Sequence, residues 1–169
     1  MVWVQGVVDG LLAAEIDLVA QLPDGATGPI VERLEEAGTE TVLVEREESA
    51  VAAAAGTWVT GDRGAVICQS SGLANSFNAL GSLAVPARLP FVAIISRRGN
   101  LGEFNIAQVP AGYSLPGMLE EMGVRNTSIS EPGGISETVQ MAAETAFSTR
   151  TPYVLFLETT LTGYGQEAQ

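Results

Sequence analysis

The chain has 169 residues, of which 46% are hydrophobic, and this length suits one domain with a substantial core. Its 20 acidic and 8 basic residues give a net charge of −12, and every basic residue is an arginine, because lysine is absent as well as histidine. Without histidine there is no imidazole base or metal ligand, and without lysine there is no Schiff base. The excess of negative charge argues against binding to nucleic acid, which needs clustered positive charge.

Short apolar runs alternate with longer amphipathic stretches, which is typical of a parallel sheet covered by helices. The expected elements, in chain order, are helix 4–15, strand 17–21, helix 30–37, strand 41–44, helix 47–60, strand 65–69, helix 73–85, strand 91–95, a long loop 99–113, a helix from there to 122, strand 125–129, helix 135–148 and strand 153–157. The sequence therefore predicts a single doubly wound α/β domain over residues 1–169. We expect five or six mostly parallel strands, helices on both faces of the sheet and a mobile end at 163–169.

Neither the single cysteine nor the N-terminus indicates secretion or membrane insertion. Cys68 lies in the apolar run 65–68, which predicts a buried core thiol and not a nucleophile. No apolar run approaches the ~18 residues of a membrane span. Acidic residues among the first apolar ones argue against a signal peptide. We therefore expect a soluble, cytoplasmic protein.

Polar residues gather where the expected strands end. Ligands of parallel α/β sheets bind beyond the carboxyl ends of the strands. The residues at these ends are Asp24, Glu47, Gln69, Ser71, Gly72, Arg97 and Arg98. The sequence therefore predicts that the functional side chains lie along one edge of the sheet.

Glu47 opens the alanine-rich helix 47–60. The helix dipole favours an acidic residue in the first turn by about 0.3–1 kcal/mol, and this explanation is sufficient for Glu48. Glu47 differs because it shares a helical face with Val51 and Ala54, which form a small-residue packing surface. If that surface meets another chain, Glu47 lies in an interface, where its carboxylate can hold a polar heterocycle.

Gln69 and the residues after it have a structural alternative. A strand-to-helix turn with Ser71 as the cap and Gly72 for conformational freedom explains one hydroxyl but not the whole polar cluster. Asn75, on the following helix, either lines the same edge or faces water.

Three further sites are open between structure and function. Asp24 suits the turn chemistry of a Pro-Asp-Gly sequence. Gln108 is an amide within the expected long loop. Arg97 and Arg98 close a buried strand, and we expect one of them to bind an anionic group and the other to lie in solvent.

Two motifs together resemble a known family. Glu47 is followed nine residues later by Gly56, and the segment Gln69-Ser70-Ser71-Gly72-Leu73-Ala74-Asn75 follows one strand further on. With these motifs, nearly the whole chain resembles the pyrimidine-binding domain of thiamine diphosphate enzymes, and within that family the alpha subunits of sulfopyruvate decarboxylases.

The resemblance implies a 2-oxo acid decarboxylase, with conversion of 3-sulfopyruvate to sulfoacetaldehyde and carbon dioxide as the leading reaction. It implies that the residue matching Glu47 bonds the pyrimidine ring and activates the cofactor, and that Asp24 is an active-site acid. The implied cofactor contacts are Glu47, Gln69, Ser71, Gly72 and Asn75. The implied substrate contacts are Gln69, Gln108 and Arg97.

The family's diphosphate and metal motif, which begins Gly-Asp-Gly, does not occur in this chain, because Gly61-Asp62-Arg63 differs at its third position. The resemblance therefore implies that a beta subunit holds the diphosphate and Mg²⁺, with no metal ligand on this chain, in a hetero-oligomer. The alternatives are phosphonopyruvate decarboxylase, a related decarboxylase or carboligase subunit, and, from another class, a non-catalytic binding or scaffold subunit.

Overall fold

Six strands form one parallel sheet in the order β2-β1-β3-β4-β6-β5. The computed structural model describes residues 1–163, so the expected mobile end lies outside the described residues except for Gly163. The strands are β1 (Leu18–Gln21), β2 (Glu40–Leu43), β3 (Gly64–Gln69), β4 (Val92–Ser96), β5 (Arg125–Ile129) and β6 (Tyr153–Leu157). The prediction of a doubly wound α/β fold with five or six strands is confirmed, and every strand pair is parallel.

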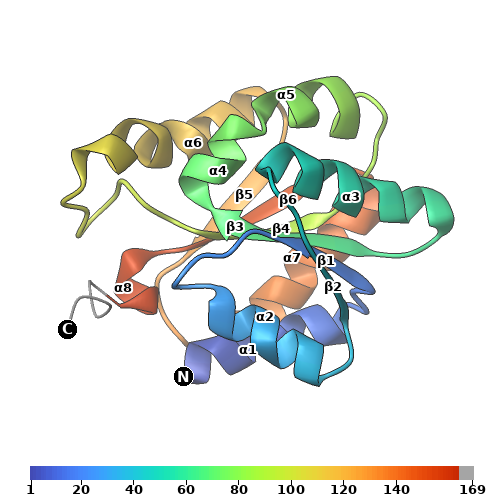
Figure 1. Cartoon of the computed structure of the whole chain (residues 1–169), viewed down its shortest axis with the longest axis horizontal. Helices are drawn as coiled ribbons and strands as arrows, with labels where there is room; N and C mark the ends of the chain where they lie inside the picture. The colour runs from blue at the N-terminus through green and yellow to red at the C-terminus, as the bar shows by residue number, and fades with distance from the viewer. Residues whose placement is uncertain (164–169) are drawn as a thin grey trace.

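Helices cover both faces of the sheet, as Figure 1 shows. One face carries α1 (Val2–Ala13), α2 (Gly28–Glu36) and α7 (Ile135–Thr149). The other face carries α3 (Glu47–Thr60), α4 (Ser70–Asn75), α5 (Phe77–Ala79), η1 (Leu80–Ala84) and α6 (Val109–Glu121). The short helices η2 (Ile106–Gln108) and α8 (Thr159–Thr162) complete the described chain.

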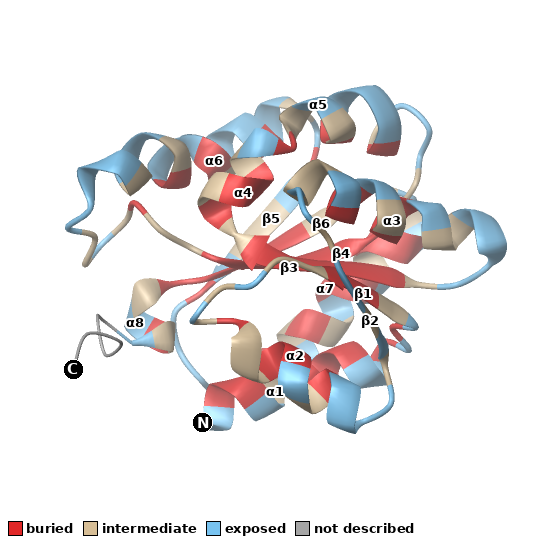
Figure 2. Ribbon diagram, in the orientation of Figure 1, coloured by how far each residue is buried: buried red, intermediate tan, exposed pale blue. Residues whose placement is uncertain are grey.

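The core has two halves, one on each side of the sheet. Side chains of the central strand β3 alternate between them, so that Ala65 and Ile67 face α1 and α7 while Val66 and Cys68 face α3 and α4. All four residues are buried, and Figure 2 shows the central strands β3 and β4 as buried, whereas the edge strands β2 and β5 are mostly exposed or intermediate. This continuous apolar run is what a parallel strand covered on both faces requires. None of the helices in residues 1–163 is long and apolar enough to span a membrane.

The helix expected at 73–85 differs most from the structure. It begins earlier, at Ser70, breaks at Ser76 and ends as the π-helix η1. The break follows from the buried Ser76 hydroxyl, which donates a hydrogen bond to the carbonyl of Gly72 at 3.2 Å. Serine side chains that bond the preceding turn in this way compete with the helical hydrogen bonds and bend the helix.

The loop expected at 99–113 is also shorter than predicted. Its second half is helical, because η2 begins at Ile106 and α6 at Val109. Pro110 lies in the first turn of α6, where its missing N–H is not needed and its fixed φ favours the helix. The loop proper is therefore residues 97–105, directly after β4.

Candidate active site

Glu47 is held by packing against Gly72. Glu47 is the first residue of α3, and Gly72 lies in α4, directly after β3. A Cβ on Gly72 would lie 2.5 Å from Cγ and 2.6 Å from Cδ of Glu47, so any larger residue would collide with the glutamate. The carboxylate of Glu47 makes no hydrogen bond or ion pair with the rest of residues 1–163. Its neighbour Glu48 instead pairs with Arg46 at 2.8 Å.

Asp24, Gln69 and Ser71 form a chain of hydrogen bonds beside Glu47. The Gln69 amide donates to Asp24 Oδ1 at 3.5 Å, and the Ser71 hydroxyl donates to Gln69 Oε1 at 2.7 Å. The Thr27 hydroxyl donates to the other oxygen of Asp24 at 3.3 Å. Because β1 and β3 are neighbours in the sheet, the residues that follow them meet. The structural alternative, in which Ser71 caps the helix, does not apply, because α4 begins one residue earlier, at Ser70, with Gln69 as its N-cap.

The sheet places this cluster where ligands of doubly wound folds bind. After β1 the chain crosses to β2 on one side, and after β3 it crosses to β4 on the other. The carboxyl ends of β1 and β3 therefore flank the point where the strand order reverses.

Cys68 lies beneath the cluster and is not part of its chemistry. Burial raises the pKa of the Cys68 thiol far above its ordinary value, and the negative charges of Glu47 and Asp24 raise this pKa further. The thiol is therefore a core group and not a nucleophile, as the sequence predicts. The two carboxylates act on the same buried sulfur, so both lie close to the end of β3.

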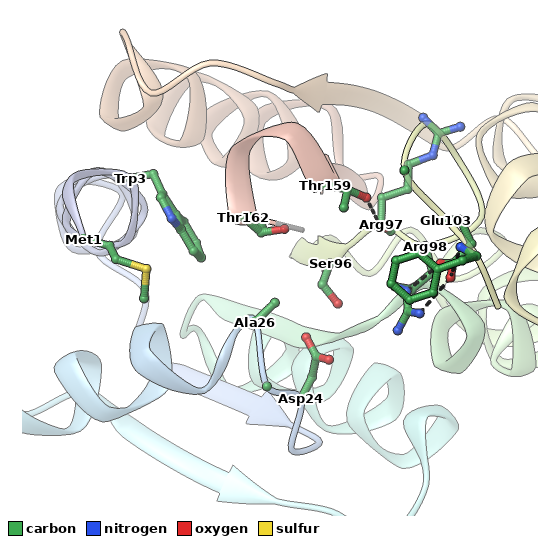
Figure 3. Close-up of a pocket in the computed structure, with 14 residues that line it drawn as sticks. Met1, Trp3, Asp24, Ala26, Ser96, Arg97, Arg98, Glu103, Thr159 and Thr162 are labelled. Atoms are coloured by element: carbon green, nitrogen blue, oxygen red, sulfur yellow. Dashed lines mark hydrogen bonds and ion pairs between the residues drawn. The ribbon is translucent and has the colours of Figure 1, made fainter. Parts of the chain in front are cut away.

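Both arginines after β4 are paired with carboxylates, so the expectation that one of them lies in solvent is wrong. Arg97 pairs with Glu158 at 2.7 Å, and its side chain is only 11% exposed. Arg98 pairs with Glu103 through two hydrogen bonds of 2.6 and 2.9 Å. Figure 3 shows that the Arg97 guanidinium points away from the cavity and that of Arg98 lies beside it. The hydrogen bonds to Glu103 raise the pKa of Arg98, and the nearby negative charge of Asp24 raises this pKa by a smaller amount.

The other two candidates lie apart from the hydrogen-bonded chain. Gln108 ends η2, and its amide oxygen is buried without a hydrogen-bond partner within the described residues. Asn75 is exposed at the end of α4. Their roles remain predictions.

A cavity of about 330 Å³ opens between the ends of β1 and β4. Asp24, Ser96 and Arg98 line it, together with Thr159 of α8 and Trp3 of α1 (Figure 3). The sequence interpretation missed Ser96, although it is a polar residue at the end of a buried strand, as Gln69 is. Trp3 and Thr159 carry no local signal, because they reach the cavity only through the packing of distant elements.

Comparisons with known proteins identify the family. Residues 1–102 match the family model described as thiamine pyrophosphate enzyme, N-terminal TPP binding domain. The chain belongs to this family. The matched range contains Asp24, Glu47, Gln69, Ser71 and Gly72.

Curated relatives of this TPP-binding domain are decarboxylases. The chain is 28% identical over 155 residues to sulfopyruvate decarboxylase subunit alpha of Methanococcus maripaludis, covering 91% of this chain and 93% of the relative. It is 29% identical to the subunit of the same name from Methanothermobacter thermautotrophicus, covering 91% and 94%. It is also 38% identical over 104 residues to phosphonopyruvate decarboxylase of Streptomyces viridochromogenes, covering 61% of this chain and 26% of that enzyme.

A solved structure confirms the fold. The 2-oxoglutarate:ferredoxin oxidoreductase from Magnetococcus marinus superposes with a TM-score of 0.80 at 16% identity, covering 96% of this chain and 29% of that one. At this identity the likeness supports the architecture alone.

The residues present fit one half of thiamine diphosphate. The Glu47 side chain occupies the space that a Cβ on Gly72 would fill, and its carboxylate has no hydrogen-bond partner within residues 1–163, which leaves its oxygens available to a polar ring. No group of His, Cys, Asp or Glu within residues 1–163 could hold a metal ion.

Proposed function

We propose that this chain is the alpha subunit of a thiamine diphosphate-dependent 2-oxo acid decarboxylase that converts 3-sulfopyruvate to sulfoacetaldehyde and carbon dioxide. The observation that carries the proposal is the carboxylate of Glu47, which packs on Gly72 at the switch point of the sheet with no partner of its own. A chain without lysine or histidine needs a cofactor that brings its own reactive carbon.

In this proposal the residues of the chain bind and orient the cofactor and the substrate, and they transfer protons. When bound, thiamine diphosphate supplies the nucleophilic carbon and takes up the electrons that decarboxylation releases. Glu47 would hold the pyrimidine by sharing a proton between its carboxyl group and a ring nitrogen. Asp24, held by Gln69 and Thr27, donates or accepts a proton at its carboxyl oxygens near the reacting end of the substrate.

A beta subunit completes the site in this proposal by holding the diphosphate and Mg²⁺. The support is the missing Gly-Asp-Gly motif and the name "subunit alpha" carried by relatives of nearly equal length. Large apolar side chains on the segment after β4 also suit a covered surface, since Leu101 and Ile106 are 75% and 85% exposed. Calorimetry of thiamine diphosphate with Mg²⁺, on this chain alone and on the reconstituted pair, tests whether the cofactor site is divided between two subunits. Tight binding by the lone chain would overturn it.

Replacing Glu47 by Gln tests the function directly. The variant keeps the size of the side chain and removes its charge, so we expect proton exchange at the thiazolium C2 in the reconstituted pair to fall by about 10²-fold or more. NMR of the bound cofactor measures this exchange without any substrate. Glu48→Gln on the same helix turn is the matched control and is expected to exchange normally. Normal exchange in Glu47→Gln would remove Glu47 from the mechanism.

Phosphonopyruvate is the second candidate substrate. It is favoured by the 38% identity to phosphonopyruvate decarboxylase, and sulfonate and phosphonate are both tetrahedral anions. The ratio of kcat/KM for the two acids decides between them. If the reconstituted pair released no carbon dioxide from any 2-oxo acid, a non-catalytic binding or scaffold role would replace this proposal.

A further inference from the structure

Ser96 carries a buried hydroxyl that the described chain leaves without a partner. Ser96 is the last residue of β4, and it is only 3% exposed. Its Oγ makes no hydrogen bond within residues 1–163, although it lies on the wall of the cavity. Figure 3 shows this hydroxyl directed into the cavity. Most buried polar groups in proteins have a partner, so an unpaired hydroxyl facing a cavity indicates a ligand group there.

Arg98 presents a cation to the same cavity. Glu103 binds its Nε and Nη2 at 2.6 and 2.9 Å, and this leaves Nη1 without a bond to the described residues. The backbone N–H groups of Gly99 and Asn105 donate to the same carboxylate at 3.1 and 2.8 Å. The backbone N–H of Arg98 is itself fixed by the Ser70 hydroxyl at 3.0 Å. The free face of the guanidinium is therefore held in one orientation, with Glu103 as a positioning residue.

A hydroxyl and a preorganised guanidinium together complement an oxygen-rich anion. Asp24 lines the same cavity and accepts a hydrogen bond from Gln69 at the end of β3, so in the proposed function the reacting end of the substrate lies toward Asp24 and the remainder lies toward Ser96 and Arg98. A fixed cation on the carboxylate that leaves would stabilise the ground state more than the transition state and slow the reaction. A cation that binds an acid group retained on the product does not have this cost, because that group keeps its charge throughout the reaction.

We infer that Ser96 and Arg98 bind the second acid group of the substrate, the one retained after decarboxylation, and so select 2-oxo acids that carry a tetrahedral anion on C3. This inference rests on the proposed function and deepens it. It makes Ser96 a residue that touches substrate, and it moves the contact assigned to Arg97 by the sequence to its neighbour. Arg97 instead pairs with Glu158 and so links the loop after β4 to the end of β6.

The test uses the reconstituted pair with 3-sulfopyruvate and the variant Ser96→Ala. Because the Ser96 hydroxyl has no hydrogen bond to any of residues 1–163, its removal should not disturb the fold. We expect KM to rise about 10- to 100-fold, the contribution of a hydrogen bond to a charged group, and kcat to stay within about twofold. The control is Ser148→Ala, an exposed residue near the end of α7 that does not line the cavity and whose hydroxyl donates to the carbonyl of Thr145 at 3.3 Å. An unchanged KM, or a fall in kcat at constant KM, would overturn the inference.

A binding measurement on the lone chain separates this inference from the proposed function. Titration with 3-sulfopropanoate, which has no keto group to react, should shift the side-chain ¹⁵N resonance of Arg98 in the wild type. The shift should be weaker in Ser96→Ala, and the affinity for 3-sulfopropanoate, measured by calorimetry, should fall in Arg98→Lys, which keeps the charge. Propanoate, which lacks the second acid, should give no shift. Equal shifts with both acids contradict the inference, whereas a decarboxylase that fails with every 2-oxo acid contradicts the proposed function.

Discussion

The carboxylates along the active edge of the sheet fall into two environments. Glu103 accepts two hydrogen bonds from Arg98 and three from backbone N–H groups, and its side chain is 3% exposed. Glu158 accepts bonds from Arg97, Ser128 and Asn100. Glu47, on the opposite side of the switch point, accepts none from the described chain. The first two are parts of the scaffold, and the third is available to a ligand.

The number of hydrogen-bond donors around each carboxylate separates structural from functional carboxylates in this fold. A buried carboxylate costs stability unless donors surround it, and the chain supplies those donors wherever the carboxylate holds two strands together. Around Glu47 the chain provides no donors within the described residues. Gly72 only makes space for the side chain, and the carboxylate oxygens stay without hydrogen bonds. The predictions below test this contrast by the free energy of unfolding that each change removes.

Glu158→Ala should give the largest loss. It leaves Arg97 buried beneath the sheet edge with no counter-charge, and breaking a buried pair in this way costs about 3–5 kcal/mol. Urea unfolding followed by the fluorescence of Trp3 and Trp58 measures the change. Glu144→Ala is the control, because Glu144 pairs with Arg63 on the surface at 50% exposure, and should cost less than about 1 kcal/mol. Equal losses would show that burial of the pair is not what stabilises this edge.

The Glu103 pair should make stability depend on pH. The hydrogen bonds from Arg98 lower the pKa of Glu103 from 4.5 to about 2. A lowered pKa in the folded state adds stability that is fully present above pH 4.5 and is lost as the pH falls toward 2. The difference in unfolding free energy between the wild type and Glu103→Gln should therefore be constant near neutral pH and shrink below pH 4.5. Urea unfolding from pH 7 to pH 3 measures it, and a constant difference over that range would contradict the assignment.

The sequence predicts the strand ends better than it predicts the pairs between them. Continuous apolar runs locate β3 and β4, and the polar residues at their ends, Gln69 and Arg97, follow directly. The pair of Arg97 with Glu158 joins residues 61 apart in sequence, and it depends on β4 and β6 being neighbours. Nothing local indicates which of two consecutive arginines turns toward Glu158. Ser96 was not assigned to the site for a related reason. Only the structure shows that its buried hydroxyl has no hydrogen-bond partner among the described residues.

Two glycines that contact α3 should respond differently to the same substitution. A Cβ on Gly64 would lie 2.8 Å from the Cα of Ala54, so Gly64→Ala must move backbone and should cost about 1–3 kcal/mol. The three atoms nearest to a Cβ on Gly72 all belong to the side chain of Glu47. Because that side chain has no bond to lose, Gly72→Ala should cost less than about 1 kcal/mol while displacing the carboxylate.

The effects of these two substitutions on cofactor activation should have the reverse order of their effects on stability. Proton exchange at the cofactor should fall in Gly72→Ala as it does in Glu47→Gln, and it should persist in Gly64→Ala at temperatures where that variant is folded. A large loss of stability in Gly72→Ala would mean that Glu47 is fixed by contacts of its own.

Glu47→Gln should have the smallest effect on stability. A carboxylate that accepts no hydrogen bond from the chain leaves no donor unpaired when it becomes an amide, so we expect a change within about 0.5 kcal/mol. The loss of one negative charge from a chain of net charge −12 is favourable, and this offsets the loss of the interaction between Glu47 and the helix dipole at the start of α3. Glu103→Gln, measured beside it at neutral pH, removes the acceptor of a charged pair and should cost more. If Glu47→Gln were the more damaging of the two, Glu47 would belong to the scaffold, and the free carboxylate on which the function rests would not exist.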